Sequence, residues 1–285
     1  MDDSPATARP TPGNLARVLP RSPKQRSALV KLRSFVSTVF IIFATLLGIA
    51  LAFLVRLMDW SGETVLILAR HWSRSLLWFA GVKVDVTWRA PLSADGRAYV
   101  FMANHLSTVD IWAIYAAFPF RLRMLAKKQL AHIPLFGWAM RAGRFIFIDR
   151  GNAAAARRSI DQAKERIRHG HHVLIFPEGT RSRDGRLAPF KKGGFHLAID
   201  AGAPIVPVAI RGSQEPMPPG SLLLAPGHVE IVVGAPIPTE GLSEEDRHHL
   251  LDRVRTIIAH ELPGTEVIPQ SALDPRTARE APTST

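Results

Sequence analysis

The sequence contains no cysteine among its 285 residues. This absence excludes a disulfide framework, a thiolate nucleophile and a cysteine-based zinc site, and it is typical of a reducing compartment. Acidic residues are also scarce, since 24 Asp and Glu stand against 36 Lys and Arg, which gives a formal net charge of +12. This excess favours anionic partners, which include nucleic acid, a membrane surface and phosphate-bearing small molecules.

Long apolar runs are limited to one. Residues 35–55 are uncharged and mostly apolar, and a membrane helix needs about 20 such residues. Residues 1–34 are rich in Pro, Arg and Ser, and we expect them to form a flexible basic arm. Because such an arm stays cytoplasmic, a single crossing would place the rest of the chain on the outside.

Residues 64–81 could form a second helix that returns the chain to the cytoplasmic side. Their apolar positions recur at helical spacing, but Arg70, His71 and Arg74 interrupt them and disfavour a spanning helix. We therefore predict that residues 35–81 form a membrane-associated helical hairpin whose second helix lies in the membrane interface. The alternative is that the second helix packs on the soluble domain.

From residue 82 onward, the pattern alternates between short apolar strands and amphipathic helices. It predicts an α/β fold over residues 82–262, with a mixed, largely parallel sheet flanked by helices, and a disordered tail over residues 263–285. Ser243, followed by acidic residues, is predicted to cap the last helix. The expected strands are 82–88, 98–103, 144–148, 172–176, 204–210 and 229–233, and the expected helices are 108–118, 152–168, 194–201 and 243–262.

The stretch "NHLSTVD", residues 104–110, follows an apolar strand, and ligands of open α/β sheets gather at the carboxyl ends of strands. A histidine held by an aspartate is the arrangement that makes imidazole a general base, so His105 and Asp110 are candidates for proton transfer. Ser107 and Asp110 also match a helix capping box, which needs no chemistry. The two interpretations are compatible, because the turn that caps the helix can hold the pair.

Basic side chains follow other strands or precede a helix. Arg181 and Lys191 lie beside tight or glycine-rich turns, and Arg150 ends an apolar strand. Each of these alone is commonly an ordinary solvated side chain, but together at one edge of a sheet they make a phosphate site plausible. The three clusters are "FIFIDR" (145–150), "FPEGTRS" (176–182) and "FKKGG" (190–194).

Taken together, these motifs resemble the glycerolipid acyltransferase family, whose enzymes make phosphatidic acid from lysophosphatidic acid. The family's Asn-His-x-Ser-x-x-Asp motif is met by residues 104–110, and its strand ending on arginine by residues 145–150. Its third motif is met by "FPEGTRS", and its Val-Pro strand by "IVPVAI" (205–210). Four motifs in the family's order make the resemblance specific, and it covers about residues 75–240.

The resemblance implies that His105 is the general base and that Asp110 orients it. The arginines are implied to face the glycerol phosphate. Gln129 and Arg144 depart from the family pattern, which has an acidic residue at the first position and a small or apolar one at the second. The expected substrate-binding residues are Asn104, Ser107, Arg150, Glu178, Gly179, Thr180, Arg181 and Lys191.

The expected activity is transfer of a fatty acyl group from acyl-CoA or acyl carrier protein to the sn-2 hydroxyl of 1-acylglycerol 3-phosphate. A deprotonated hydroxyl attacks a thioester directly, so no covalent acyl-enzyme is needed. We expect no cofactor, and no metal either, because the many histidines lack the spacing of a metal site. The expected partners are the bilayer, lysophosphatidic acid and the acyl donor, without nucleic acid. The expected location is the inner (plasma) membrane, with the catalytic domain facing the cytoplasm.

Two alternatives to this activity remain open. One is acylation of another lysolipid, either a lysophospholipid with a head group or an amino-acid-derived lysolipid. The other comes from a different class, a non-catalytic, membrane-anchored binder of anionic lipid that relies on the basic arm.

Overall fold

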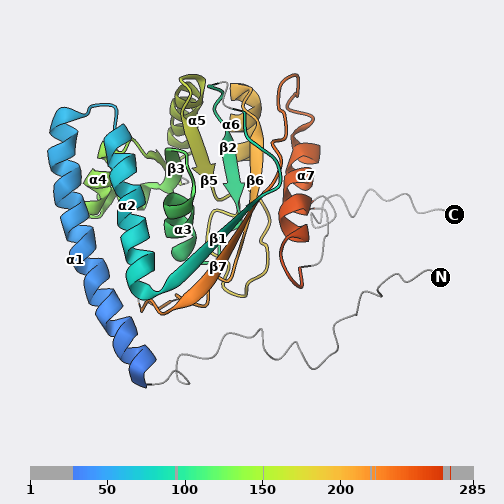
Figure 1. Ribbon diagram of the computed structural model, residues 1–285. Coiled ribbons are helices and arrows are strands. Elements are labelled where there is room, and N and C mark those ends of the chain that lie inside the picture. Colours follow the sequence, from blue (N-terminus) through green and yellow to red (C-terminus); the bar gives the residue numbers. More distant parts are fainter. Residues whose placement is uncertain are drawn as a thin grey trace, which may run out of the picture.

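A computed structural model describes residues 28–93, 96–149, 151–218, 220–221, 223–265 and 270 (Figure 1). Most of the predicted basic arm and of the predicted tail lies outside the described residues, as does Arg150. The first helix already includes Ala28, so residues 28–34 are helical rather than part of an irregular arm.

One seven-stranded sheet forms the centre of the α/β domain, in the order β1-β7-β6-β2-β5-β3-β4. Every neighbouring pair is parallel except β6 and β7, which are antiparallel. The prediction of a mixed, largely parallel sheet is therefore confirmed. The strands are β1 (Val82–Trp88), β2 (Val100–Ala103), β3 (Leu122–Lys127), β4 (Ile146–Ile148), β5 (His172–Ile175), β6 (Ile205–Arg211) and β7 (Gly227–Val233).

Helices cover both faces of this sheet, and Figure 1 shows α1, α2 and α3 on one side and α5, α6 and α7 on the other. The helices are α1 (Ala28–Met58), α2 (Glu63–Ala80), α3 (Val109–Ala117), the 3-10 helix η3 (Lys128–His132), α4 (Phe136–Ala142), α5 (Ala153–Arg168), α6 (Gly193–Ala201) and α7 (Arg247–His260).

The core is divided into two apolar layers by the side-chain alternation of the central strands. On β2, Phe101 and Ala103 belong to the layer under α2 and α3, whereas Val100 and Met102 belong to the layer under α5, α6 and α7. All four side chains are fully buried, so β2 is the centre of the sheet and its carboxyl end is a rigid position for a site.

Three elements near β4 were not predicted, namely β3, η3 and α4. Most of their residues lie in 125–143, a segment whose sequence looks like a connection. At the other end of the domain, the predicted cap of the last helix is wrong. Helix α7 begins at Arg247, and Ser243 instead bonds the Asp246 carboxylate through its backbone N–H at 2.8 Å and its hydroxyl at 2.9 Å. The local polar contact formed, but it precedes the helix.

The first two helices form a hairpin whose members have different surroundings. Helix α2 packs on α3 and β1 and buries Leu66, Leu76 and Leu77, which agrees with the packing alternative for this segment. In α1, the stretch Leu32–Met58 is long and apolar enough to cross a membrane by length and composition, and only 6% of its most apolar window is buried. The membrane role of the hairpin stays a prediction.

Candidate active site

The turn between β2 and α3 holds His105 against Asp110. The distance from His105 Nδ1 to Asp110 Oδ2 is 2.8 Å, and the same oxygen accepts the backbone N–H groups of Leu106 at 2.6 Å and Ser107 at 2.8 Å. Asp110 is fully buried, whereas the His105 side chain is 13% exposed. Because Asp110 occupies Nδ1, Nε2 is the nitrogen that remains for a ligand.

The capping contacts of this turn form only in part. Asp110 reaches back to the Ser107 N–H as a capping box requires, but Asp110 N donates to the Ser107 backbone carbonyl and not to its hydroxyl. The buried Ser107 hydroxyl donates to the Met217 carbonyl at 2.9 Å and accepts the Val109 N–H at 3.3 Å. The turn is thus tied both to α3 and to the segment after β6.

The His105 ring and backbone are fixed from the β5 side. The ring stacks on Phe176 with centroids 4.0 Å apart and an interplanar angle of 20°. The backbone N–H of His105 donates to Glu178 Oε1 at 2.7 Å, and its carbonyl accepts the Ser182 N–H at 2.8 Å. The segment after β5 therefore helps to position the imidazole together with its own turn.

Glu178 is buried and receives a second backbone donor, the N–H of Ala188, at 2.9 Å on Oε2. Burial raises the pKa of Glu178 to about 7, against the lowering effect of the two N–H donors. Both carboxylate oxygens thus contact the protein's own backbone. Its predicted substrate-binding role stays a prediction.

Asn104 is also fully buried, and its side-chain amide joins the end of β2 to β6. Its Nδ2 donates to the Ile210 carbonyl at 2.9 Å, and its Oδ1 accepts the Ile210 N–H at 2.7 Å. Regular pairing of β2 with β6 ends at Ala103 and Val208, so this contact continues the connection beyond the last strand pair.

The turn after Phe176 brings the next predicted residues beside His105. Gly179 has φ of 75°, a left-handed conformation that favours glycine, and its N–H donates to the Phe176 carbonyl at 2.9 Å. Thr180 and Arg181 are exposed, and Arg181 Nη1 donates to Thr108 Oγ1 at 2.9 Å. Their exposure leaves them accessible to an anionic ligand.

A cavity of about 480 Å³ opens beside this site. The polar part of its lining includes His105, Thr108, Lys127, Gly179, Thr180 and Arg181. Apolar side chains form most of the rest, among them Ile49 of α1, Leu68 and Trp72 of α2, Trp112 of α3, Met124 of β3 and Met140 of α4. A space of this size and lining suits an elongated apolar ligand whose polar end meets His105.

The structure does not bring all predicted residues to this cavity. Lys191 is exposed and is not among the lining residues, although its backbone N–H donates to the Pro177 carbonyl at 2.8 Å. Arg150 lies outside the described residues. Within the described part of the chain, no group of three or more His, Asp or Glu gathers as a metal site would require.

Sequence reasoning missed the residues that support the imidazole and shape the cavity. Phe176 ends the β5 strand run in "FPEGTRS", and an aromatic residue at that position could have suggested a stacking partner. No local pattern indicated that α1 and α2 contribute to the cavity wall. Helical spacing of apolar residues such as Ile49 in α1 and Leu68 in α2 predicts a buried face, but it does not tell whether that face meets the core or a cavity.

The fold and the site together define an α/β domain in which a candidate general base meets an apolar cavity. Residues 83–211 match the family model described as Acyltransferase. This match assigns residues 83–211, which include His105, Asp110 and Arg181, to the acyltransferase family.

Curated relatives carry a more specific description. The chain is 32% identical over 199 residues to 1-acyl-sn-glycerol-3-phosphate acyltransferase of Cocos nucifera, which covers 68% of this chain and 62% of that protein. It is 34% identical over 178 residues to the human 1-acyl-sn-glycerol-3-phosphate acyltransferase alpha, which covers 61% of this chain and 62% of that protein. The chain thus spans about three fifths of the length of these relatives.

A solved structure has a similar fold over most of the chain. It is the 1-acyl-sn-glycerophosphate (LPA) acyltransferase PlsC of Thermotoga maritima, with a TM-score of 0.69 and 25% sequence identity. The similarity covers 81% of this chain and 95% of that one.

Proposed function

We propose that this protein transfers a fatty acyl group from a thioester to the sn-2 hydroxyl of 1-acylglycerol 3-phosphate, giving phosphatidic acid for phospholipid biosynthesis. One observation carries the proposal, namely the 2.8 Å contact between His105 Nδ1 and Asp110 Oδ2 at the wall of an apolar cavity. The names of the relatives supply the acceptor, and acyl-CoA or acyl carrier protein supplies the acyl group.

The proposed reaction is a direct acyl transfer. His105 Nε2 takes the proton of the acceptor hydroxyl while the hydroxyl oxygen forms a bond to the thioester carbonyl carbon. Asp110 holds the Nδ1–H tautomer and stabilises the imidazolium that results. When the tetrahedral intermediate collapses, the carbon–sulfur bond breaks and the thiolate takes the proton from His105. The products are phosphatidic acid and a free thiol, and the reaction needs no cofactor.

Arg181 is the proposed partner of the acceptor phosphate. Its guanidinium lies at the polar part of the cavity, where Thr108 holds one of its nitrogens at 2.9 Å. A guanidinium binds phosphate oxygens through two parallel N–H donors, which gives both energy and orientation. The proposal keeps Arg150 as a second phosphate ligand on the strength of its place in the sequence motif. Gly179 and Thr180 line the same part of the cavity, so their proposed role is to shape the acceptor site.

The apolar part of the cavity is the proposed site of a substrate's acyl chain. Burial of each methylene group contributes about 0.8 kcal/mol, so a chain that fills the cavity binds strongly without any specific polar contact. Because α1 and α2 form one wall, a chain could enter from the side of the molecule that carries the exposed apolar surface of α1.

We also propose that the hairpin of α1 and α2 associates with the inner (plasma) membrane and leaves the catalytic domain on the cytoplasmic side. Support comes from the large apolar side chains that α1 exposes, including Phe43 at 62% and Leu57 at 64%. Exposed apolar surface of this extent is costly in water and stable in a bilayer. A lysolipid acceptor would then reach the cavity without leaving the membrane.

The test is an acyl-transfer assay on the purified full chain, with acyl-CoA and acyl carrier protein as separate donors. Lysophosphatidic acid is compared with neutral-head-group and amino-acid-derived lysolipids. We expect turnover with lysophosphatidic acid and loss of that turnover in His105→Ala. Turnover only with a different lysolipid would overturn the acceptor, and equal rates for both proteins would overturn the mechanism and favour a non-catalytic lipid binder.

A further inference from the structure

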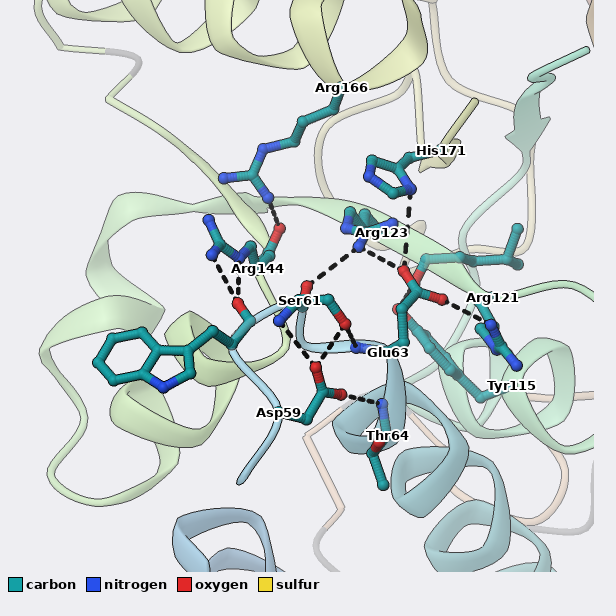
Figure 2. A network of polar contacts seen from close by, with 12 residues as sticks. Asp59, Ser61, Glu63, Thr64, Tyr115, Arg121, Arg123, Arg144, Arg166 and His171 are labelled. Carbon is teal, nitrogen blue, oxygen red and sulfur yellow. Dashed lines mark hydrogen bonds and ion pairs between the residues drawn. The ribbon is translucent and has the colours of Figure 1, made fainter. Parts of the chain in front are cut away.

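A second cavity, of about 240 Å³, lies at the opposite end of the parallel strands from His105. Arg123 is the second residue of β3, and His171 immediately precedes β5, so both lie at the amino ends of their strands. Arg144 precedes β4, and Arg166 lies in the last turn of α5. Figure 2 shows these four side chains around the connection between α1 and α2. His169, Glu165 and Ser61 complete the lining.

The guanidinium of Arg123 is the central group of this cavity. Its side chain is 1% exposed, and Nη2 donates to Glu63 Oε1 at 2.6 Å and to the Ser61 carbonyl at 3.4 Å. Its other two nitrogens, Nε and Nη1, are buried without a hydrogen-bond partner among the described residues. Buried, unsatisfied charged donors cost free energy, so they indicate a missing acceptor at this place.

The neighbouring arginines are held so that they surround the same space. Arg144 donates through Nε and Nη2 to the Trp60 carbonyl, at 3.1 and 2.6 Å, and Arg166 donates through Nη1 to the Arg144 carbonyl. Neutral carbonyl acceptors leave the charge of both guanidinium groups uncompensated. Three cationic side chains therefore converge on one small cavity.

Acidic groups near this cavity compensate only part of the charge. Glu63 is shared among Arg123, Arg121 and His171, whose Nδ1 lies 3.8 Å from Glu63 Oε1, and Glu165 contacts Arg168 at 3.0 Å. Asp59 accepts from Ser61 and Thr64. The pKa of His171 is lowered by burial and then by the positive charge of Arg123, which agrees with an excess of positive charge here.

We propose that this cavity binds a phosphate group, as free inorganic phosphate or as the head-group phosphate of an anionic lipid. Guanidinium groups match phosphate oxygens with paired N–H donors, and a tetrahedral oxyanion fits a space of this volume. It would give the unpartnered nitrogens of Arg123 the acceptor that they lack. This site is separate from the acyl-transfer site and does not rest on the proposed function.

The surroundings of the cavity give the lipid source a physical basis. Met58, the last residue of α1, is 90% exposed, and Trp60 in the connection to α2 is 70% exposed, with Arg56 4.2 Å above its ring. Aromatic and basic side chains of this kind are typical of the membrane interface, where head-group phosphates lie. A bound phosphate would also tie β3 and α5 to the start of α2, because Arg123 already contacts Glu63.

The experiment compares Arg166→Gln with Arg158→Gln in the full chain. Arg158 lies on the same helix, is exposed and is absent from the cavity lining, so it is a matched control. The melting temperature of each protein in neutral detergent is measured with sodium phosphate against sodium chloride of equal ionic strength. In a second arm, each protein is placed in nanodiscs of phosphatidylcholine with or without phosphatidylglycerol.

We expect the wild type and Arg158→Gln to gain at least about 2 °C in one of the two arms, and Arg166→Gln to lose most of that gain. A gain in detergent identifies free phosphate as a ligand, and a gain only with phosphatidylglycerol identifies a lipid head group. Equal responses of wild type and Arg166→Gln in both arms, or no response in either protein, would overturn the proposal and leave water as the partner of Arg123.

Two further variants keep the result interpretable. All proteins are also measured in an Arg181→Gln background, so that phosphate bound near His105 does not contribute to the difference. If Arg166→Gln does not fold, Arg166→Lys keeps the charge and removes the paired donors. Its response must fall below that of the wild type, and an equal response would overturn the proposal.

Discussion

The two ends of the parallel strands hold buried charge in different ways. At the carboxyl end, Asp110 Oδ2 accepts two backbone N–H groups and the His105 ring, and Glu178 accepts one backbone N–H on each oxygen. At the amino end, Arg123 is equally buried, but two of its nitrogens have no partner among the described residues. At the first end the chain itself provides partners for three of these four carboxylate oxygens, and Asp110 Oδ1 has none among the described residues. At the second end two of the three guanidinium nitrogens of Arg123 have none.

The carboxyl end therefore has a geometry that does not depend on a ligand, whereas the amino end depends on one. A carboxylate fixed by backbone donors keeps its position whether or not a substrate is bound, as a site for proton transfer requires. A guanidinium with unused donors gains most when an external anion arrives. We therefore expect substitutions at the carboxyl end to change catalysis or its pH range, and substitutions at the amino end to change the response to phosphate.

The largest expected effect is that of His105→Ala at the carboxyl end. Loss of a positioned general base lowers turnover by about 10²- to 10⁴-fold. His132→Ala, which removes an exposed histidine of η3, is the control and should keep the rate of the wild type. The rates are measured as thiol release from acyl-CoA with lysophosphatidic acid. A loss of less than tenfold would exclude His105 as the base.

A second prediction concerns the pH dependence of stability. The pKa of Glu178 is raised to about 7 from 4.5. A carboxyl group whose pKa is higher in the folded state stabilises the fold fully at a pH below its unfolded-state pKa. This contribution is lost as the pH rises through its folded-state pKa. Between about pH 5 and pH 8 the wild type should therefore lose up to about 3 kcal/mol of unfolding free energy relative to Glu178→Gln.

Urea unfolding in detergent at several pH values measures this difference, and the exposed substitution Glu245→Gln is its control. Parallel curves for wild type and Glu178→Gln over this range would show that the two backbone donors compensate for the burial of the carboxylate. Burial of the Glu178 carboxylate would then not lower the free energy of unfolding.

A third prediction tests the apolar side of the same end. Ala69 of α2 lines the large cavity, so Ala69→Trp should fill part of it and shift the preferred acyl chain to a shorter length. We expect long-chain turnover to fall by about tenfold, since each methylene in a pocket is worth about 1 kcal/mol or more. His71→Trp places the same side chain on an exposed position. An unchanged chain-length profile would place the acyl chain elsewhere.

The smallest expected effect on stability is that of Arg123→Met at the amino end. The substitution removes the unsatisfied donors and keeps an unbranched side chain in the core, while Glu63 retains Arg121 at 3.0 Å. Without phosphate, the unfolding free energy should change by no more than about 1 kcal/mol. With phosphate, the wild type alone should gain stability. A loss of about 3 kcal/mol or more without phosphate would show that Arg123 is a structural group.

The sequence predicted the layered α/β fold and the proximity of His105 and Asp110, because both depend on local patterns. It did not predict β3, whose sequence "LRMLAK" carries Arg123. The partner of this arginine, Glu63, lies 60 residues earlier, so no local pattern indicates that an arginine can be buried in a strand here. It also did not predict α4, which is seven residues long and follows Leu135 at a φ of 62°. Short elements next to strained backbone carry little periodic signal.

The same limit applies within the candidate site. Glu178 and Asn104 were predicted from motifs as substrate-binding residues. In the structure, Glu178 contacts backbone N–H groups 73 and 10 residues away, and Asn104 contacts a backbone group 106 residues away. No pattern in one sequence identifies such partners, because a backbone N–H exists at nearly every position. The motif located these residues, and only the fold could show what they contact.

The contact between Asn104 and Ile210 has a consequence for amide hydrogen exchange. The Ile210 N–H is held by a side chain at 2.7 Å, beyond the last regular pair of β2 with β6. Its protection against exchange with deuterium therefore reports the stability of the turn that carries His105, and not that of the strand pairing itself. One amide on β6 thus provides a spectroscopic measure of how often the site opens in the otherwise folded protein.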